Sequence, residues 1–275
     1  MKPLVVDYEK EHSFRHSAKG EEMGYETLLY EVEGEIGILT YNRPDKVNAV
    51  DHKMNEELND FWAERQRDFD TRVLIVHGAG DKGFCSGLDL RDAMNVPGGV
   101  TPENLYNSQD SFSRVIRLMR TCPQPIIAAV HGPAMGAGLS FALAADVRLA
   151  SEDAFFCAQY INIGTGGADL GSSYFLWRLV GWGRAAEMCM TGDRVPADEA
   201  HRIGLVNHVY TRDELMPAAM AMATNMVSKN KLGLRFTKDA LNAALNASSL
   251  EDANRMENRN QAFVILSGLK EPKQD

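Results

Sequence analysis

Residues 83–90 read Gly-Phe-Cys-Ser-Gly-Leu-Asp-Leu, and residues 131–140 read His-Gly-Pro-Ala-Met-Gly-Ala-Gly-Leu-Ser. Each stretch follows a short apolar run, and each has the small residues of a tight turn that leads into a helix. Two such turns, brought together, would direct two backbone N–H groups at one oxygen atom. That arrangement is an oxyanion hole, which stabilises the negative charge that develops on a carbonyl as it reacts.

The apolar runs before these turns predict the sheet. Residues 73–76 read Val-Leu-Ile-Val and residues 126–130 read Ile-Ile-Ala-Ala-Val, with no polar residue in either run. Continuous apolar runs are typical of strands that are buried on both faces. The order strand, turn, helix, strand occurs twice at similar spacing, which predicts an α/β fold built from stacked repeating turns.

The remaining elements follow from hydrophobic periodicity and from turn residues. Strands are expected at 27–32, 36–41, 147–150, 155–157 and near 206–209, and helices at 48–69, 104–120, 139–145, 184–192, 197–203, 213–228, 231–245 and 250–267. We therefore predict a polar, loosely ordered extension over residues 1–24, an α/β core over 25–200 and a C-terminal helical region over 201–275.

Composition excludes several classes of protein. The chain has 275 residues, a net charge of −9 and an apolar fraction of 44%, which fits a soluble globular protein and argues against binding to nucleic acid or an anionic membrane. Neither a signal sequence nor a membrane-length apolar run is expected, so we predict a cytoplasmic location. The four cysteines, Cys85, Cys122, Cys157 and Cys189, form no Cys-x-x-Cys pair, which predicts free thiols and no zinc site.

Seven segments follow one another as they do in a known family. They are 42–49 (Asn-Arg-Pro-Asp-Lys-Val-Asn-Ala), 83–90, 125–132 (Pro-Ile-Ile-Ala-Ala-Val-His-Gly), 136–138 (Gly-Ala-Gly), 144–148 (Ala-Ala-Asp-Val-Arg), 179–181 (Leu-Val-Gly), and 197–200 (Ala-Asp-Glu-Ala) with 204–206 (Gly-Leu-Val). On these segments, which span most of residues 26–265, the chain resembles the crotonase (enoyl-CoA hydratase/isomerase) superfamily.

The resemblance implies a crotonase-like spiral of stacked ββα units, with a C-terminal helical region that builds a homotrimer or homohexamer. It also implies an acyl-CoA substrate, whose coenzyme A is part of the substrate, and no prosthetic group or metal. By motif position, the backbone N–H groups of Leu88 and Ala137 would hold the thioester oxygen. The resemblance places coenzyme A along residues 43–49. The residues expected to bind it are Arg43, Lys46, Val47, Ala49, Ser86 and Leu88.

The chain departs from the family at two positions. Hydratases of the family usually carry two glutamates there, and this chain has Ser140 and Tyr160 instead. Either residue could hydrogen-bond a water, and Tyr160 could donate to an enolate; the alternative is that both only fill space. The remaining candidate for proton transfer is Asp169, which resembles a catalytic aspartate of dienoyl-CoA isomerases. The alternative for Asp169 is a helix N-cap that serves residue 172 or 173.

Three further polar residues are considered for a nucleophilic or metal-binding role. Ser140 would be a nucleophile only if a base lay within hydrogen-bond reach, and the next histidine in the chain is His201. His77 and His131 each follow a predicted strand at the same place, and we expect both to be structural. Neither has the carboxylate or thiol spacing of a metal site.

These observations predict an enoyl-CoA hydratase/isomerase that acts on an acyl-CoA thioester through an enolate, with Asp169 as the proton-transfer residue. With both usual glutamates replaced, double-bond isomerisation fits better than hydration, which ordinarily needs two carboxylates. Two alternatives remain. One is a hydrolase of the same fold that cleaves a carbon–carbon bond in a β-diketone and needs no coenzyme A. The other is a non-catalytic acyl-CoA-binding paralogue.

Overall fold

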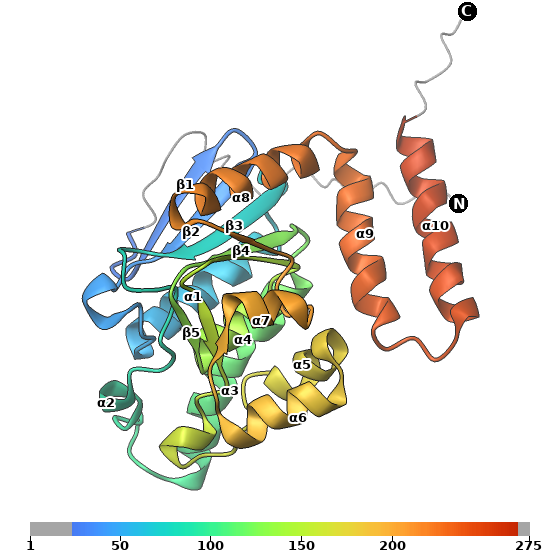
Figure 1. Ribbon diagram of the computed structural model, residues 1–275. Helices are drawn as coiled ribbons and strands as arrows, with labels where there is room; N and C mark the ends of the chain where they lie inside the picture. The colour runs from blue at the N-terminus through green and yellow to red at the C-terminus, as the bar shows by residue number, and fades with distance from the viewer. Residues whose placement is uncertain (1–23, 269–275) are drawn as a thin grey trace, which may run out of the picture.

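The main sheet has six strands in the order β1-β2-β3-β4-β6-β9 (Figure 1). The computed structural model describes residues 24–268, so the predicted extension lies outside the described residues but for its last residue. The strands are β1 (Leu28–Glu33), β2 (Ile36–Tyr41), β3 (Val73–Gly78), β4 (Ile126–Val130), β6 (Val147–Ser151) and β9 (His208–Tyr210). Only β1 and β2 pair antiparallel, and the other neighbours in this sheet pair parallel.

A second sheet contains β5 (Pro133–Met135), β7 (Phe155–Cys157) and β8 (Val195–Pro196). The sequence predicts only β7, because β5 lies in a segment read as a turn and β8 has two residues, too few to show alternation. Cys85 of the first glycine turn bridges to Ala134 of β5, which pairs in turn with Phe156 of β7. Successive turns of the chain therefore stack on one another, which confirms the predicted α/β spiral.

Helices of the core cover one face of the main sheet and pack around the second sheet. They are α1 (His52–Arg65), α2 (Leu90–Ala93), α3 (Pro102–Thr121), α4 (Ala137–Ala144), α5 (Ser172–Val180), α6 (Trp182–Thr191) and α7 (Ala197–Arg202). The helix predicted over 48–69 is shorter at both ends. It begins after Asp51, whose side chain accepts a hydrogen bond from the Met54 N–H. Val47 and Asn48 precede it with positive φ angles of 52° and 54°, which a right-handed helix does not allow.

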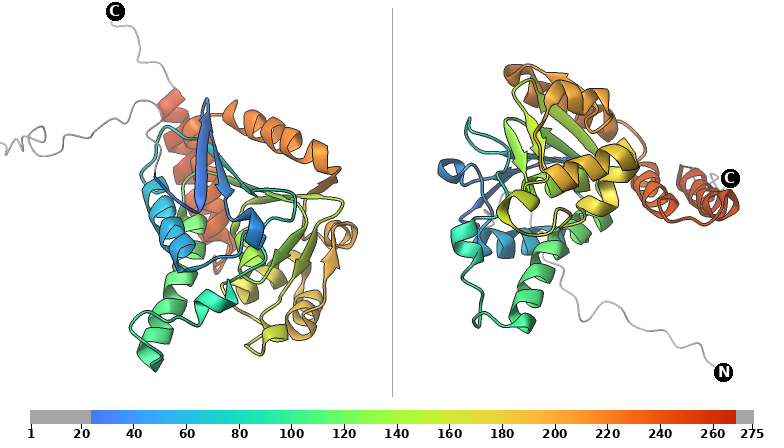
Figure 2. Two further views of the ribbon diagram at one scale, coloured as in Figure 1. Left: turned by 90° about the vertical axis from the view of Figure 1, so that its left-hand side faces the viewer. Right: turned by 60° about the horizontal axis from the view of Figure 1, so that its bottom comes forward.

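Helix α8 (Arg212–Val227) covers the opposite face of the main sheet. Its Leu215, Ala219 and Ala223 are buried with Ile75 and Ile127 of the strands, and Figure 2 shows α8 and α1 on opposite sides of the strands. The predicted boundary at residue 200 therefore falls inside the core, because β9 extends the sheet and α8 covers it.

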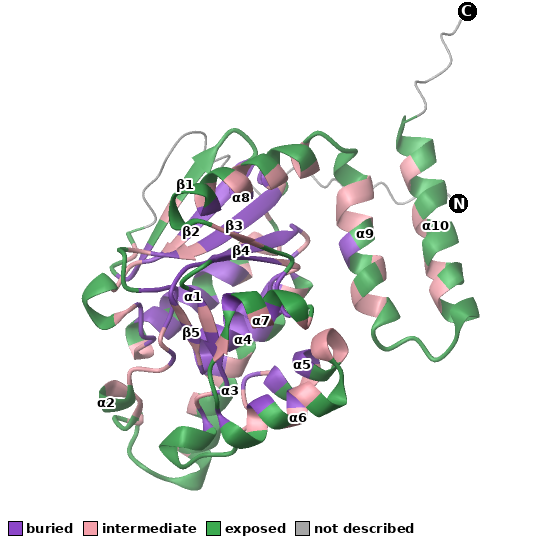
Figure 3. Cartoon of the chain, in the orientation of Figure 1, coloured by how far each residue is buried: buried purple, intermediate pink, exposed green. Residues whose placement is uncertain are grey.

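Helices α9 (Lys231–Ala244) and α10 (Leu250–Gly268) form a hairpin beside the core (Figures 1 and 2). Within this hairpin, α10 has no buried residue and α9 has only Lys238 (Figure 3). The predicted helical tail is thus present, but the part that stands apart from the core begins at α9.

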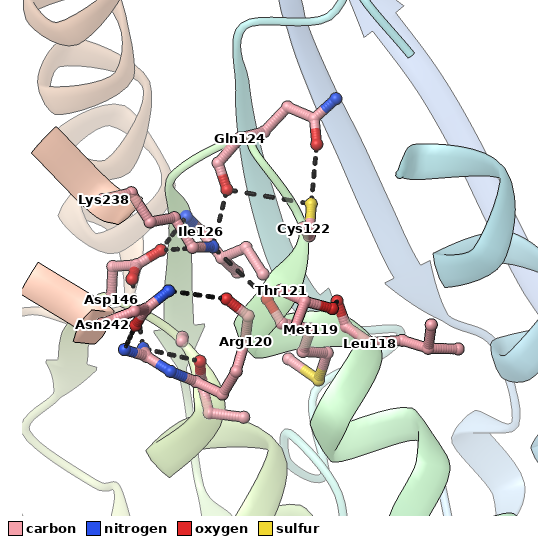
Figure 4. A network of polar contacts seen from close by, with 12 residues as sticks. Leu118, Met119, Arg120, Thr121, Cys122, Gln124, Ile126, Asp146, Lys238 and Asn242 are labelled. Atoms are coloured by element: carbon pink, nitrogen blue, oxygen red, sulfur yellow. Dashed lines mark hydrogen bonds and ion pairs between the residues drawn. The ribbon is translucent and has the colours of Figure 1, made fainter. Parts of the chain in front are cut away.

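A buried polar network fastens α9 to the core (Figure 4). The Lys238 ammonium lies 2.9 Å from the Asp146 carboxylate and donates to the Gln124 carbonyl over 2.8 Å. Arg120 of α3 pairs with the same carboxylate at 3.1 Å, and Asn242 donates to the Arg120 carbonyl. These contacts hold α9 in place although it buries little apolar surface.

All four cysteines are free, as predicted: three are buried and Cys189 is half-buried. In the part of the chain that the structure describes, no helix combines the length and the apolar character that crossing a bilayer requires.

Candidate active site

The backbone around Leu88 turns the Leu88 amide away from Val50, with which Leu88 forms an isolated parallel bridge. The Val50 N–H donates to the Gly87 carbonyl, and the Val50 carbonyl accepts from the Asp89 N–H, each over 2.8 Å. In a parallel bridge of this kind, the residue between the two bonded neighbours directs its N–H to the opposite side. The Leu88 N–H therefore points away from Val50.

The second glycine turn lies directly against the first. Gly87 has a φ of 102°, and a Cβ at this position would lie 2.9 Å from the Met135 carbonyl oxygen and 3.6 Å from the Ala137 nitrogen. Only glycine combines that φ with so close an approach. The turn that carries the Leu88 amide thus touches the turn that carries the Ala137 amide.

Ala137 is the first residue of α4, so its N–H has no partner inside the helix. Within residues 24–268, neither the Leu88 N–H nor the Ala137 N–H donates a hydrogen bond to another protein group. Two unpaired amides on touching turns, one of them at a helix N-terminus, are groups of the kind that stabilise a developing negative charge. The structure brings these two predicted site residues together.

Ser140 and Tyr160, at the two departures from the family pattern, are hydrogen-bonded to each other. Their hydroxyl oxygens lie 2.5 Å apart, and the Tyr160 hydroxyl donates to the Gly136 carbonyl over 2.7 Å. Because Tyr160 has one proton, Ser140 is the donor between them. Both side chains are buried, and burial raises the pKa of Tyr160 well above its usual value. Two neutral, mutually satisfied hydroxyls therefore occupy these positions.

These contacts decide between the roles considered for Ser140 and Tyr160. The Tyr160 proton is held by a protein carbonyl, so this hydroxyl is not free to donate to an enolate. Ser140 is fully buried, and besides Tyr160 its hydroxyl bonds the Asp169 backbone carbonyl, at 3.4 Å. Among residues 24–268 no histidine bonds this hydroxyl, and the His201 ring lies next to Val206 and His208. The described residues therefore give Ser140 no base of the kind that a serine nucleophile needs.

Asp169 lies in the segment before α5, partly exposed. Its Oδ1 accepts from the Gln109 side-chain amide over 2.6 Å and from the Leu170 N–H over 2.7 Å. Its backbone lies beside Ser140 of α4, on the helix that Ala137 begins. The structure thus places the one carboxylate candidate next to the helix that presents an oxyanion donor.

The N-cap alternative for Asp169 is wrong. The N-cap residue of α5 is Gly171, and no side chain caps this helix. Asp169 and Ser172 are joined through the Asp169 backbone, since the Ser172 N–H donates to its carbonyl and the Ser172 hydroxyl accepts from its N–H. Leu170 has a positive φ of 44°, a conformation that costs about 1–2 kcal/mol outside glycine and that concentrates at functional sites.

The loop expected to bind coenzyme A lies beside Leu88. The Ser86 N–H donates to the Val47 carbonyl over 3.0 Å, and the Ser86 hydroxyl donates to the Lys46 carbonyl over 3.3 Å. Lys46 is exposed and Ala49 is buried. The structure therefore brings the predicted set Arg43, Lys46, Val47, Ala49, Ser86 and Leu88 into one region.

Arg43 points inward rather than toward solvent. Its guanidinium forms ion pairs with Asp51 at 2.9 Å and with Asp89 at 3.2 Å, and it donates to the Ala49 carbonyl. Its charge is therefore balanced within the protein. In contrast, Lys46 has no ion pair among the described residues.

Two residues of the site, Asn48 and Gln109, were not predicted from the sequence. Asn48 is fully buried: its Oδ1 accepts from the Arg43 N–H, and its Nδ2 donates to the Gly83 and Ala79 carbonyls. It joins the loop to the first glycine turn. Gln109 lies on an exposed face of α3. The residue type at position 48 was the one available hint, since asparagine adopts a positive φ more readily than most residues, and the structure shows that angle here.

His77 and His131 are structural, as predicted. The His77 ring bonds the Thr40 hydroxyl at 2.8 Å and the His131 ring bonds the Gly80 carbonyl at 3.0 Å. Two surface hollows, of about 450 Å³ beside Tyr25 and about 120 Å³ between α6 and α7, lie away from the glycine turns. The site is identified by its amides and not by these hollows.

Comparison with known proteins gives a consistent result. Residues 31–267 match the family model "Enoyl-CoA hydratase/isomerase". The chain is 40% identical over 235 residues to a Mycobacterium bovis protein named "Probable enoyl-CoA hydratase echA12", covering 84% of this chain and 82% of that protein. It is 32% identical over 219 residues to the 1,2-epoxyphenylacetyl-CoA isomerase of Escherichia coli, covering 80% and 83%. The crystal structure of an enoyl-CoA hydratase from Bacillus anthracis superposes with a TM-score of 0.82 at 28% identity, covering 88% of this chain and 92% of that one.

Proposed function

Because the chain belongs to the enoyl-CoA hydratase/isomerase family, we propose that it moves a double bond within an acyl-CoA thioester. The Leu88 and Ala137 amides hold the thioester oxygen, and Asp169 transfers the proton. The observation that carries this proposal is the pair of unpaired amides on the two touching turns, with the backbone of Asp169 beside the helix that Ala137 begins.

The chemistry follows from where charge develops. Removing a proton from the carbon next to a thioester carbonyl leaves an enolate, whose negative charge lies largely on the carbonyl oxygen. An amide aimed at that oxygen lowers the barrier by roughly 3 kcal/mol. In a 3-enoyl thioester, Asp169 would take the proton from C2 and return it to C4, so that the double bond moves to C2–C3 and no atom is gained or lost.

The choice of isomerisation over hydration rests on the polar groups at the site. Adding water across a double bond by paired carboxylates uses one group to activate water and another to protonate carbon. At the two positions in question this chain has Ser140 and Tyr160, which are neutral and bonded to each other. Asp169 is the carboxylate that we assign to proton transfer, since Asp89 beside Leu88 is paired with Arg43. A single such group is enough to carry a proton between two carbons.

Coenzyme A would lie along residues 43–49, with Lys46 as the charge available to its phosphates. Because the Arg43 charge is balanced by Asp51 and Asp89, we assign Arg43 to holding the loop.

The test is to incubate the protein with a 3-enoyl-CoA in deuterated water and follow the product by NMR. Formation of the 2-enoyl isomer, with no water added across its double bond, supports the proposal. Faster conversion of a 2-enoyl-CoA to the 3-hydroxy product would overturn it in favour of hydration. Binding of acyl-CoA with no exchange at C2 would favour a non-catalytic binder, and cleavage of a β-diketone without coenzyme A would favour the hydrolase.

We also propose that α9 and α10 mediate assembly of a homotrimer or homohexamer in the cytoplasm. Apolar side chains are exposed along this hairpin, among them Leu241, Leu250, Phe263, Ile265 and Leu266. Several large apolar side chains exposed on one pair of helices are the kind of surface that an interface covers. A monomer measured by light scattering at micromolar concentration would contradict the assembly.

A further inference from the structure

We propose that Tyr160 is a positioning residue that acts through the Gly136–Ala137 peptide bond to strengthen and aim the Ala137 amide. Tyr160 does not touch substrate in this arrangement. This inference rests on the proposed function, in which that amide receives the thioester oxygen, and it gives a role to a buried hydroxyl that the reaction itself does not use.

The argument begins with the peptide unit. The Gly136 carbonyl and the Ala137 N–H belong to the same trans peptide, so they point in opposite directions. The Gly136 oxygen accepts two hydrogen bonds, one from the Tyr160 hydroxyl over 2.7 Å and one from the Ser140 N–H over 3.1 Å. Groups that hold the oxygen on one side thereby hold the N–H on the other.

Gly136 makes this restraint necessary. It has φ 50° and ψ −117°, a conformation that glycine adopts and that other residues avoid. Because glycine also permits neighbouring conformations at little cost, the plane of the following peptide is poorly restrained by its own backbone. A second donor on the Gly136 carbonyl oxygen restricts the orientation of that peptide plane, and with it the direction of the Ala137 N–H.

The same hydrogen bonds make the amide a better donor. Ser140 donates to Tyr160, Tyr160 donates to the Gly136 carbonyl, and the Ala137 N–H of that peptide would donate to the substrate oxygen. Hydrogen bonds in such a chain polarise one another, so each donor is strengthened by the one behind it. The strengthening matters most when the final acceptor carries a negative charge.

A space-filling role would not need this hydroxyl. Phenylalanine would fill the same volume, and a buried hydroxyl lowers stability unless it is hydrogen-bonded. The core offers a matched comparison in Tyr41, which is fully buried against Phe84 and Phe141. Its hydroxyl has no hydrogen-bond partner among the described residues. Tyr41→Phe therefore removes a buried hydroxyl without removing a hydrogen bond to the Gly136–Ala137 peptide.

The experiment uses acetoacetyl-CoA as the probe, because its enolate absorbs in the near ultraviolet. The pH at which half of the bound probe is ionised is measured in the unaltered protein and in Tyr160→Phe. We expect this pH to rise by about one unit in Tyr160→Phe, which is a tenfold loss of enolate stabilisation and the effect of one hydrogen bond. Affinity for butyryl-CoA, which forms no enolate here, should change by less than about threefold.

Ser140→Ala is the second variant, because it removes the hydroxyl that donates to Tyr160. The change removes a single oxygen atom, so this variant should fold even if Tyr160→Phe does not. We expect it to shift the same midpoint in the same direction by a smaller amount, and Tyr41→Phe to leave it unchanged. An unshifted midpoint in folded Tyr160→Phe, or in Ser140→Ala if that variant alone folds, overturns the inference. The pH at which half of the probe is ionised should be lower when the probe is bound to the unaltered protein than when it is free in solution. If it is not lower, the proposed function fails first, and this inference fails with it.

Discussion

The guanidinium of Arg43 lies 3.2 Å from the carboxylate of Asp89, the residue that follows Leu88 in the first glycine turn. The same guanidinium reaches Asp51, the N-cap of α1, at 2.9 Å. One side chain therefore ties the loop of residues 43–49 both to α1 and to the first glycine turn. A basic residue in a loop expected to bind phosphates thus works as an internal brace.

Replacing Arg43 with methionine separates these roles. The change leaves two partly buried carboxylates without their partner, and we expect the free energy of unfolding to fall by about 2 kcal/mol, between the values for exposed and buried pairs. The ratio of the affinities for CoA and for 3′-dephospho-CoA, measured by calorimetry, should stay as in the unaltered protein. A ratio that falls to one would show that Arg43 binds the phosphate. Lys46→Met is the comparison in which we expect the affinity to weaken.

Asp169→Asn should abolish turnover, because the amide cannot accept the proton that the carboxylate carries. Its fold and its ligand site should persist, so CoA affinity is expected to stay within about threefold. Steady-state kinetics and calorimetry on the same preparation measure both. Asp213→Asn, at an exposed position in the first turn of α8, is the matched control and should retain activity. Unchanged rates in Asp169→Asn would remove this residue from the mechanism.

Gln109→Met removes the side-chain donor to the Asp169 Oδ1, which leaves only the Leu170 N–H on that atom. The carboxylate should then be less well oriented, and we expect kcat to fall by about tenfold, the effect of one hydrogen bond, with KM little changed. A rise in KM at constant kcat would indicate instead that Gln109 contacts the substrate.

Stability should fall as the pH drops below about 6.5. Burial lowers the pKa of His77, and burial together with the nearby Arg212 lowers the pKa of His131. Unfolded histidine, with a pKa near 6.5, binds a proton in a range where the folded protein does not, so stability is full above that pH and is lost below it. Each histidine contributes up to about 1.4 kcal/mol per pH unit.

Urea unfolding at pH 7.5, 6.5 and 5.5 measures this dependence. His77→Gln can keep a hydrogen bond to Thr40 while removing the titration, so it should flatten the curve. His208→Gln, at an exposed position, should keep the original slope. An identical slope in His77→Gln would show that other groups cause the loss.

Lys238→Met should release α9 from the core. Lys238 is nearly fully buried and is held by Asp146 and by the Gln124 and Met119 carbonyls, so its loss should cost about 3 kcal/mol. Limited proteolysis between α8 and α9 should become faster, as read by mass spectrometry. Lys231→Met, exposed on the same helix, is the control; equal cleavage of the two variants would contradict an anchoring role for Lys238.

The local features of this fold are predictable from the chain alone. Residues 73–76 and 126–130 are apolar throughout, and each leads into a turn of small residues, so strand, turn and helix follow from nearest neighbours. Helix α3 and strand β2 lie where periodicity places them. The errors fall on short or irregular segments. Strands β5 and β8 are too short to show a pattern, and the start of α1 depends on positive φ angles that the sequence does not announce.

Sequence alone therefore determined the repeating α/β turns, the two glycine-rich segments and the absence of the usual carboxylates at positions 140 and 160, because these depend on residues adjacent in the chain. Tertiary structure alone decided that Arg43 points inward, that α8 belongs to the core, and that Tyr160 donates to Gly136. Arg43 and Asp89 are 46 residues apart, and Tyr160 and Gly136 are 24 apart. Which partner a side chain takes depends on how whole elements pack, and no local pattern records that.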